Sequence, residues 1–215
     1  MKKLLILGLL LAFSALPISS VSQADQVSFT VSANVPAATG VAITPFVVNT
    51  ANPNNATPVA GTTLDFGTLQ YDAQNGIYRP SVFFYVDVTG TGGAGNPDVT
   101  ATYTETVAGN PNSVLGKNGL GKKGTATFTK VTFGALPADT VVTGLQSHGP
   151  KKTLSNVNET INETELAGGI LRIYLGLADL NSQATFVDPS DAEVFTNTDQ
   201  PGDYFGTLLV SATID

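Results

Sequence analysis

The chain of 215 residues contains no cysteine and no tryptophan, and it has a single histidine. Without cysteine there is no disulfide framework, no thiolate zinc site, no cysteine nucleophile and no lipidated N-terminal cysteine. One histidine also excludes a multi-histidine metal site. A carboxylate pair for glycoside hydrolysis stays open, but such sites usually lie among aromatic platforms that bind the sugar, and this chain has no tryptophan. The fold must therefore be stabilised by packing and strand pairing alone.

Charged residues are few, at 13% of the chain, and acidic residues outnumber basic ones by 17 to 10. The formal net charge is −7, and it becomes more negative by two when Lys2 and Lys3 are removed with the segment described next. Nucleic acid and anionic membranes are therefore poor partners.

The first 24 residues have the pattern of a secretory signal peptide. Lys2 and Lys3 precede an apolar run over residues 4–16, and the segment closes with small residues up to Ala24. The apolar run is too short to span a bilayer, and no later run is long and apolar enough. We therefore expect residues 1–24 to be removed on export through the periplasm.

The rest of the chain predicts an all-β fold. Threonine and valine are abundant and helix formers are sparse, and β-rich runs alternate with clusters of Gly, Pro and Asn that form turns. Roughly 190 residues suffice for one domain, and the regular strand spacing predicts a β-sandwich. The expected strands cover residues 27–35, 41–48, 62–70, 77–89, 99–107, 125–133, 140–145, 169–177 and 204–214.

The first expected strand alternates regularly between apolar and polar residues. Because side chains alternate across a strand, the apolar residues fall on one face and Ser, Thr and Asn on the other. Pro36 ends this strand, and the next one is expected to begin at Val41. The apolar face consists of Val27, Phe29, Val31, Ala33 and Val35.

The last expected strand has a complementary alternation and runs to the end of the sequence. By itself, the alternation fits ordinary first and last strands equally well, each of which buries one face in the core of its own domain. The face that is expected to be apolar consists of Tyr204, Gly206, Leu208, Val210, Ala212 and Ile214.

Together, the two ends resemble the subunits of chaperone-usher pili, especially the cysteine-free alternate or archaic type. The N-terminal resemblance is the alternating apolar extension that ends at Pro36. The C-terminal resemblance is a Gly-x-Tyr-x-Gly strand formed by Gly202, Tyr204 and Gly206. Residues 64–68, Leu-Asp-Phe-Gly-Thr, also look like the LxFG strand of pilin and spore-coat-U-like domains.

This resemblance implies an immunoglobulin-like β-sandwich over residues 41–215 that is incomplete because it lacks one strand. Residues 25–40 are then a donor-strand extension and hinge, and they fill a groove beside the C-terminal strand of a neighbouring subunit. The implied partners are other copies in a homopolymer, a periplasmic chaperone and an outer-membrane usher. The implied location is an extracellular fimbrium that supports adhesion or biofilm formation, without enzymatic activity or cofactors.

Residues 116–123, Gly-Lys-Asn-Gly-Leu-Gly-Lys-Lys, have most of the spacing of a phosphate-binding loop. Such a loop requires a strand before the glycines and a helix after them. Here a β-rich run follows, and Lys123 stands where a Ser or Thr should bind magnesium. We interpret the segment as a flexible basic loop.

No other motif indicates a catalytic or metal site. His148 lies in a turn sequence and is expected to be a solvated loop residue. The acidic region before the last strand lacks the alternating ligand spacing of a calcium loop. A self-contained secreted β-sandwich that binds carbohydrate or calcium, with residues 27–35 in its own sheet, remains the alternative. The acidic residues are Asp179, Asp188, Asp191, Glu193, Asp199 and Asp203.

Overall fold

The computed structural model describes residues 27–34, 41–90, 98–105, 117–132, 151–162, 169–179 and 191–213. In these ranges the chain is dominated by β-strands, and the two helices are single 3-10 turns of three residues, η1 (Gly121–Lys123) and η2 (Leu154–Asn156). The predicted all-β class is confirmed. A helix long and apolar enough to cross a membrane does not occur within these ranges. The expected signal peptide lies outside them.

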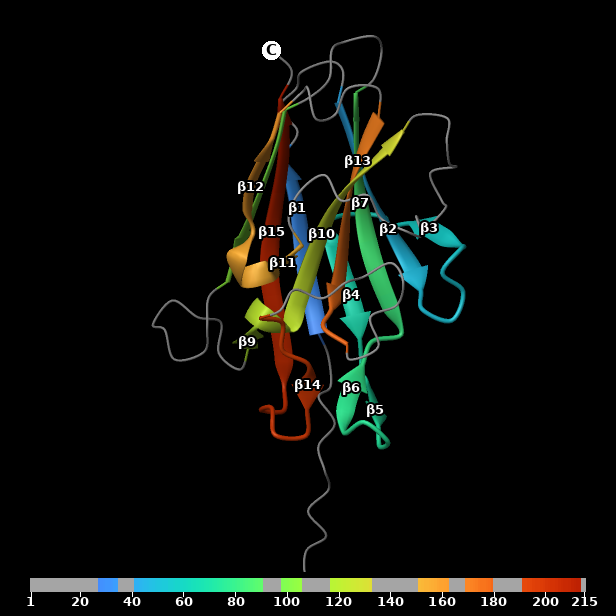
Figure 1. Cartoon of the computed structure of the whole chain (residues 1–215), viewed down its shortest axis with the longest axis vertical. Helices are drawn as coiled ribbons and strands as arrows, with labels where there is room; N and C mark the ends of the chain where they lie inside the picture. Colours follow the sequence, from blue (N-terminus) through green and yellow to red (C-terminus); the bar gives the residue numbers. More distant parts are fainter. Residues whose placement is uncertain are drawn as a thin grey trace, which may run out of the picture.

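The strands form two large sheets and one small sheet (Figure 1). Sheet A contains the first and last described strands side by side, in blue and red in Figure 1. Its order is β12 (Asn158–Ile161), β8 (Asp98–Thr104), β15 (Asp203–Thr213), β1 (Val27–Asn34) and β4 (Thr63–Gly67), with β9 (Lys117–Gly119) also paired to β15.

Sheet B is antiparallel throughout, whereas the smaller sheet C lies at the lower end of the molecule in Figure 1. The order in sheet B is β11 (Lys152–Thr153), β10 (Gly124–Thr132), β13 (Gly169–Leu177), β7 (Val82–Gly90), β2 (Val41–Asn49) and β3 (Ala56–Pro58). The order in sheet C is β14 (Phe195–Thr196), β6 (Ile77–Arg79) and β5 (Gln70–Asp72).

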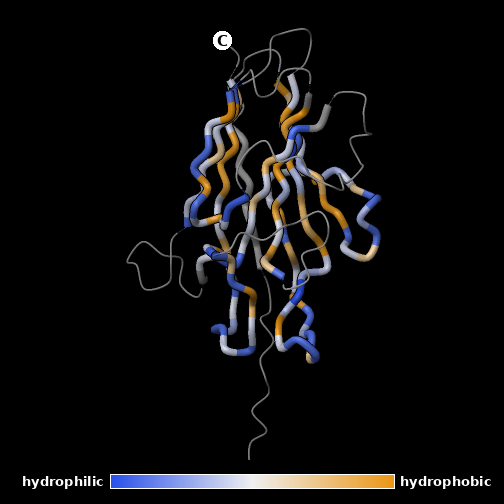
Figure 2. Tube along the Cα trace, in the orientation of Figure 1, coloured by the Kyte–Doolittle hydropathy of each residue, from blue (hydrophilic) through white to orange (hydrophobic). Residues whose placement is uncertain are grey.

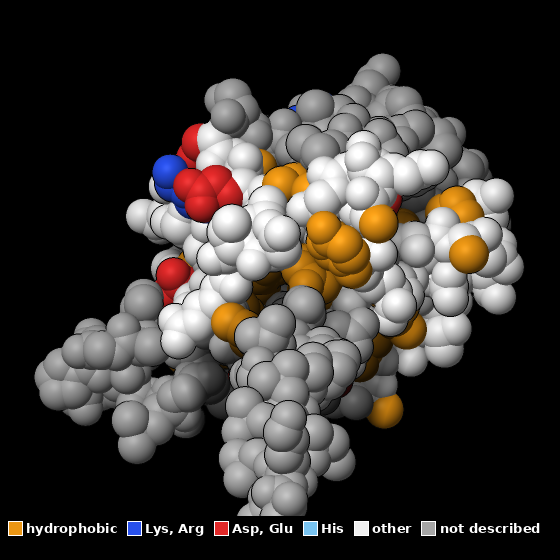
Figure 3. Space-filling model, turned by 90° about the horizontal axis from the view of Figure 1, so that it is seen from below, with side chains coloured by type: hydrophobic (Ala, Val, Ile, Leu, Met, Phe, Trp, Pro, Cys, Tyr) orange, Lys and Arg blue, Asp and Glu red, His pale blue; other side chains and the backbone are white. Residues whose placement is uncertain are grey.

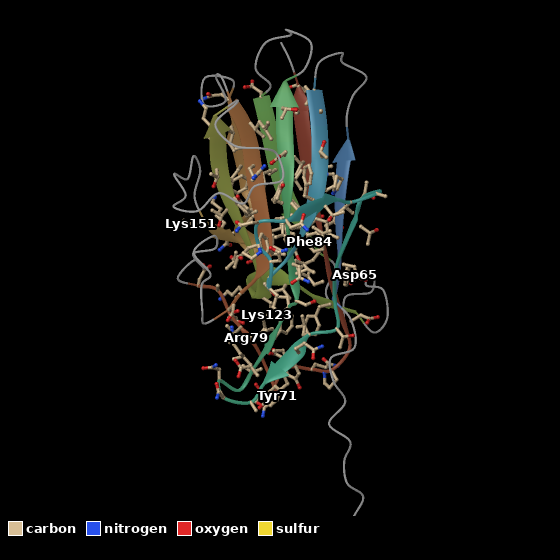
Figure 4. All side chains as sticks on the ribbon, turned by 90° about the vertical axis from the view of Figure 1, so that its right-hand side faces the viewer. Asp65, Tyr71, Arg79, Phe84, Lys123 and Lys151 are labelled. Carbon is tan, nitrogen blue, oxygen red and sulfur yellow. The ribbon has the colours of Figure 1, made fainter. Side chains whose placement is uncertain are left out.

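Sheets A and B share one hydrophobic core. Alternate residues of β7 and β13 supply sheet B's part, including Phe84, which lies near the middle of the molecule in Figure 4. Sheet A contributes Leu64 and Phe66 from β4, which are 0% and 1% exposed, together with the buried face of β15. Figure 2 shows hydrophobic residues recurring along these strands. Burying each large side chain contributes about 1.5 to 3 kcal/mol, so this core is the main stabilising feature.

Sheet B is buried on its second face as well, because six consecutive residues of β7, from Phe83 to Val88, are all buried. The face turned away from sheet A carries a cluster of aromatic rings, in which Tyr85 and Tyr174 lie edge to face at 5.7 Å. It also carries a buried ion pair: Arg172 Nε donates to Asp87 Oδ1 at 2.7 Å, and Nη2 donates to Oδ2 at 2.8 Å. The Arg172 guanidinium lies 3.9 Å from the centre of the Tyr85 ring.

Several predicted strands are divided or shifted in the structure. The expected strand 77–89 is two strands, β6 and β7, separated at Pro80 and Ser81, because proline cannot donate a hydrogen bond to a ladder. The expected strand 62–70 ends at Gly67, whose φ is 67°, and the chain resumes pairing as β5. The expected strand 140–145 lies outside the described residues. The short strands β3, β9, β11, β12 and β14 were not predicted.

Candidate functional site

The N-terminal strand β1 occupies a slot in sheet A between β15 and β4. Along one edge it pairs in parallel with β15, from Val27 opposite Tyr204 to Asn34 opposite Ser211. Along the other edge it pairs antiparallel with β4, with a register shift between Val27 and Ser28. The seated strand therefore leaves no gap between β15 and β4, and it holds together strands that do not pair with each other.

The direction of β1 is unusual for this sheet. Apart from the three-residue contact of β9 with β15, the other described strand pairs are antiparallel. Parallel neighbours require a crossover connection, and here the two partners come from opposite ends of the described sequence. If β1 left, the facing edges of β15 and β4 would lose their hydrogen-bond partners at the same time.

The burial of β15 follows the predicted alternation. Tyr204, Gly206, Leu208, Val210 and Ala212 are buried, whereas Leu209 on the other face is 40% exposed. This part of the prediction is confirmed, and Ile214 lies outside the described residues. That this face and the preceding Gly202 form the groove for a donor strand or a chaperone stays a prediction.

The register places the predicted donor residues opposite buried positions of β15. Val27, Phe29, Val31 and Ala33 are the Cα partners of Tyr204, Gly206, Leu208 and Val210, respectively. Val35 and the expected hinge, residues 35–40, lie outside the described residues. The structure therefore brings the two predicted sets together within one chain. The sequence analysis expected a sandwich with one strand missing, filled by residues 25–40 of a neighbouring subunit. This incomplete sandwich is not confirmed, because residues 27–34 lie in the sheet of their own chain.

Gly206 has a steric role that the sequence did not reveal. A Cβ atom at this position would fall inside the ring of Tyr103, which comes from the neighbouring strand β8. Gly206 is also the position opposite Phe29 in the β1 register. The second glycine of the Gly-x-Tyr-x-Gly sequence is thus required because an aromatic ring occupies the space of its side chain. Tyr103 was not among the predicted site residues.

Tyr103 is held in place by a hydrogen-bonded cluster at the end of β8. Its hydroxyl donates to the Glu105 carboxylate, and the backbone N–H of Gly121 donates to Glu105 Oε2 at 2.8 Å and to Tyr103 Oη at 3.2 Å. Burial raises the pKa of the Tyr103 hydroxyl, and the adjacent Glu105 carboxylate raises it further. The hydroxyl therefore stays protonated and available as a donor to Glu105.

A second cluster fixes the lower end of β15. The Tyr204 and Phe195 rings pack edge to face at 4.8 Å, and the Tyr204 hydroxyl donates to the Gln200 carbonyl at 2.8 Å. Lys123 Nζ donates to the Val194 carbonyl at 2.8 Å and lies 5.3 Å from the Phe195 ring centre. These contacts anchor the first residues of β15, at the end where β1 begins to pair.

The lysine-rich loop does not have the form of a phosphate site. The three-residue helix η1 is followed directly by strand β10, as the sequence indicated, so no helix N-terminus faces the glycines. Lys123 forms an ion pair with Asp199 at 2.9 Å. Our interpretation of a flexible basic loop is therefore wrong at Lys123, whose side chain is tied to the body of the protein.

Four of the five described acidic residues considered for calcium, all except Asp203, take part in other side-chain contacts. Asp179 binds Arg79, Asp199 binds Lys123, and Asp191 accepts a hydrogen bond from Asn156 at 2.8 Å. In the part of the chain that the structure describes, there is no group of three or more acidic, histidine or cysteine residues that could hold a metal ion. Asp188 and His148 lie outside that part.

Three comparisons with known proteins give no further assignment: no family model, no curated protein and no solved structure matches this chain.

Proposed function

We propose that this protein is the structural subunit of an extracellular fimbria, assembled from identical copies by donor-strand complementation. The observation that carries the proposal is the position of β1, which fills a slot whose two edges belong to strands that do not pair with each other. A segment of this kind is replaceable, because another copy of the same eight residues offers the same main-chain groups and the same side chains.

The energetics favour a stable junction. Strand addition supplies main-chain hydrogen bonds, and alternate side chains entering the core fix the register. Burial of four or five donor side chains contributes on the order of 5 to 15 kcal/mol before ordering costs are subtracted. Because donor and acceptor surfaces differ, the contact is heterologous and continues into a filament when the rotation does not close a ring.

The chain's own β1 competes with β1 of another copy for the slot between β15 and β4. β1 ends at Asn34 and β2 begins at Val41, so the segment is tethered to its own slot by six residues. A short tether gives a high effective concentration, and exchange with another copy needs a factor that keeps the slot open. A periplasmic chaperone that caps the unpaired edges, followed by an outer-membrane usher, meets this need. It also protects against the aggregation that open edges promote.

A second candidate function has the same observation in its favour. A self-contained secreted β-domain that binds carbohydrate or calcium would also seat residues 27–34 in its own sheet, as they are here. The two candidates differ in whether β1 must leave its slot for the protein to act.

A disulfide lock separates the two candidates. Thr30 and Thr63 are opposite each other in the antiparallel β1–β4 register, and the chain has no cysteine of its own. We expect Thr30→Cys with Thr63→Cys, oxidised before export is complete, to give no fibres on the cell surface, because β1 cannot leave. Reduction should restore the fibres, as counted by electron microscopy.

A matched control lock lies in the same sheet, at Thr100 and Thr160, which are opposite each other on β8 and β12 and are both exposed. Thr100→Cys with Thr160→Cys should form its disulfide and still polymerise. Fibres from the oxidised β1–β4 lock would refute the exchange mechanism. A native chain that never forms fibres in its own cells would favour the self-contained domain.

A further inference from the structure

A hollow of about 470 Å³ lies beside the hairpin formed by β2 and β3, away from the β1 slot. Two valines, Val47 on β2 and Val82 on β7, line it, and both are partly buried against the main core. The remaining lining comes mostly from polar, uncharged residues of the hairpin, Asn49, Asn52, Asn55 and Thr57. Side-chain amides of asparagine are therefore the most frequent polar groups in the lining, and the two valines are its main apolar residues.

The hairpin is held in shape by its own backbone. Asn52 N donates to the Asn49 carbonyl at 3.0 Å, and Asn55 N donates to the Asn52 carbonyl at 3.2 Å. Thr50 N donates to the Ser81 carbonyl at 2.9 Å, which ties the hairpin to the segment before β7. The turn therefore does not need the side-chain amides of Asn52 and Asn55 for its stability.

Those amides are available to a ligand. Within the described ranges, the side chains of Asn52, Asn55 and Thr57 have no hydrogen-bond partner. Each asparagine amide offers two donors and one acceptor, and the threonine hydroxyl offers a donor and acceptors. Asn49 is oriented, since its Oδ1 accepts from Ala51 N at 2.8 Å and leaves its NH₂ group free to donate.

The chemistry of the lining selects a class of ligand. Among the described residues that line the hollow none is charged, so neither an anion nor a cation gains an ion pair from them. A purely apolar ligand would leave the amides unpaired and desolvated, which is unfavourable. A molecule with many neutral hydroxyl groups and C–H surfaces can pair with the amides and lie against the valines.

We propose that this hollow binds a neutral, hydroxyl-rich ligand, namely a short uncharged oligosaccharide. The amides of Asn52 and Asn55 donate to and accept from its hydroxyls, while Val47 and Val82 contact its C–H faces. This site does not use β1, β15 or β4, so it does not depend on filament assembly. A monomer and a subunit within a fibre have the same hollow.

The test uses the whole mature chain and four neutral probes: maltotriose, cellotriose, mannotriose and diacetylchitobiose. We expect at least one of them, at millimolar concentration, to shift the side-chain amide signals of Asn52 and Asn55 in ¹H–¹⁵N spectra. Asn52→Asp and Asn55→Asp keep the shape but remove the donors, and each should weaken binding of that probe by about tenfold or more.

Asn54→Asp is the matched control, because Asn54 is exposed in the same turn and does not line the hollow. It should leave the affinity unchanged. The proposal is overturned if none of the four probes shifts these signals. It is also overturned if the shifts map to another surface, or if Asn54→Asp weakens binding as much as the other two substitutions, which would indicate an effect of surface charge alone. A short peptide that shifts the signals where the sugars do not would assign the hollow to a protein partner instead.

Discussion

Sheets A and B meet across one core, but they differ in how they are completed. Every described strand pair of sheet B is antiparallel, and its central strands β10, β13 and β7 are buried on both faces. Sheet A depends on β1, a tethered strand that runs parallel to β15 and joins it to β4. Figure 3 shows hydrophobic side chains reaching the surface at the lower end of the molecule. In the proposed assembly, sheet B is the scaffold and β1 is the strand of sheet A that is exchanged.

The largest effect is expected from removing the exchangeable strand. A chain that begins at Gly40 should aggregate, because the edges of β15 and β4 lose their pairing and the core is uncovered. Added peptide of residues 27–36 should restore a soluble monomer in size-exclusion chromatography, whereas a peptide with the apolar and polar positions interchanged should not. A soluble, cooperatively melting monomer without peptide would show that β1 is dispensable.

A charge on the apolar face of β1 should block assembly. Phe29 is the largest apolar residue of the strand and stands opposite Gly206 and Leu64 in the two registers. The donor-strand proposal places this position in the core of the acceptor, so we expect Phe29→Asp to abolish fibres, because an unpaired carboxylate in a core is strongly unfavourable. Thr30→Asp, at the next position, is the control and should still assemble. Normal fibres from Phe29→Asp would contradict the donor role of β1.

Removal of Arg172 from its buried ion pair with Asp87 should strongly destabilise sheet B. Arg172 is 0% exposed and Asp87 is 4% exposed, so Arg172→Ala leaves a buried carboxylate without its partner. The expected loss in free energy of unfolding is about 3 to 5 kcal/mol, measured by urea denaturation.

Arg79→Ala is the control for this prediction. Arg79 pairs with Asp72 and Asp179, but its side chain is 21% exposed, so the loss should be about 1 kcal/mol or less. Similar losses in free energy of unfolding for the two arginine variants would mean that burial does not make the Arg172–Asp87 pair more important for stability.

A smaller effect is expected from Gly206→Ala on β15. The added methyl group overlaps the Tyr103 ring, so the ring must move and the free energy of unfolding should fall by about 1 to 3 kcal/mol. In a Tyr103→Ala background, the same substitution should have little additional effect, because the obstructing ring is gone. An additive double mutant would show that the two residues do not interact.

The smallest effect concerns sheet C and acid pH. The Asn75 side chain, followed by Arg79, lowers the pKa of Asp72 from its ordinary value of 3.8 to about 2. Because the folded-state pKa is depressed, the stabilisation is present above about pH 4 and is lost as the pH falls towards 2. The turn between β5 and β6 should therefore loosen in this window, as seen in its amide exchange. Asp72→Asn should remove the pH dependence there.

The sequence predicted the parts of the fold that depend on local patterns. The alternation of β15 and the bounds of β13 depend on the identity of neighbouring residues, and both are found as expected. Two-residue strands such as β11 and β14 have too few residues for a periodic signal, and only long-range pairing defines them.

The candidate site was predictable only in part. The apolar face of the N-terminal strand is visible in the sequence, but its partners are not, because pairing with β4 and the direction against β15 are set by topology. Tyr103 could not be found from its neighbours, since its contact with Gly206 joins residues about a hundred positions apart. The only sign of its role in the sequence was that it is a single tyrosine in a threonine-rich strand.

The direction of β1 has a consequence for the spacing of a chain of subunits. In a parallel exchange, the segment after Asn34 leaves the slot at the end where β15 finishes, and six residues extend at most about 20 Å. The body of the donating copy must then sit directly beyond that end. Reversal of the donor strand would put it beyond sheet C instead. In the proposed fibre, the orientation of β1 thus determines which end of one subunit faces the body of the next.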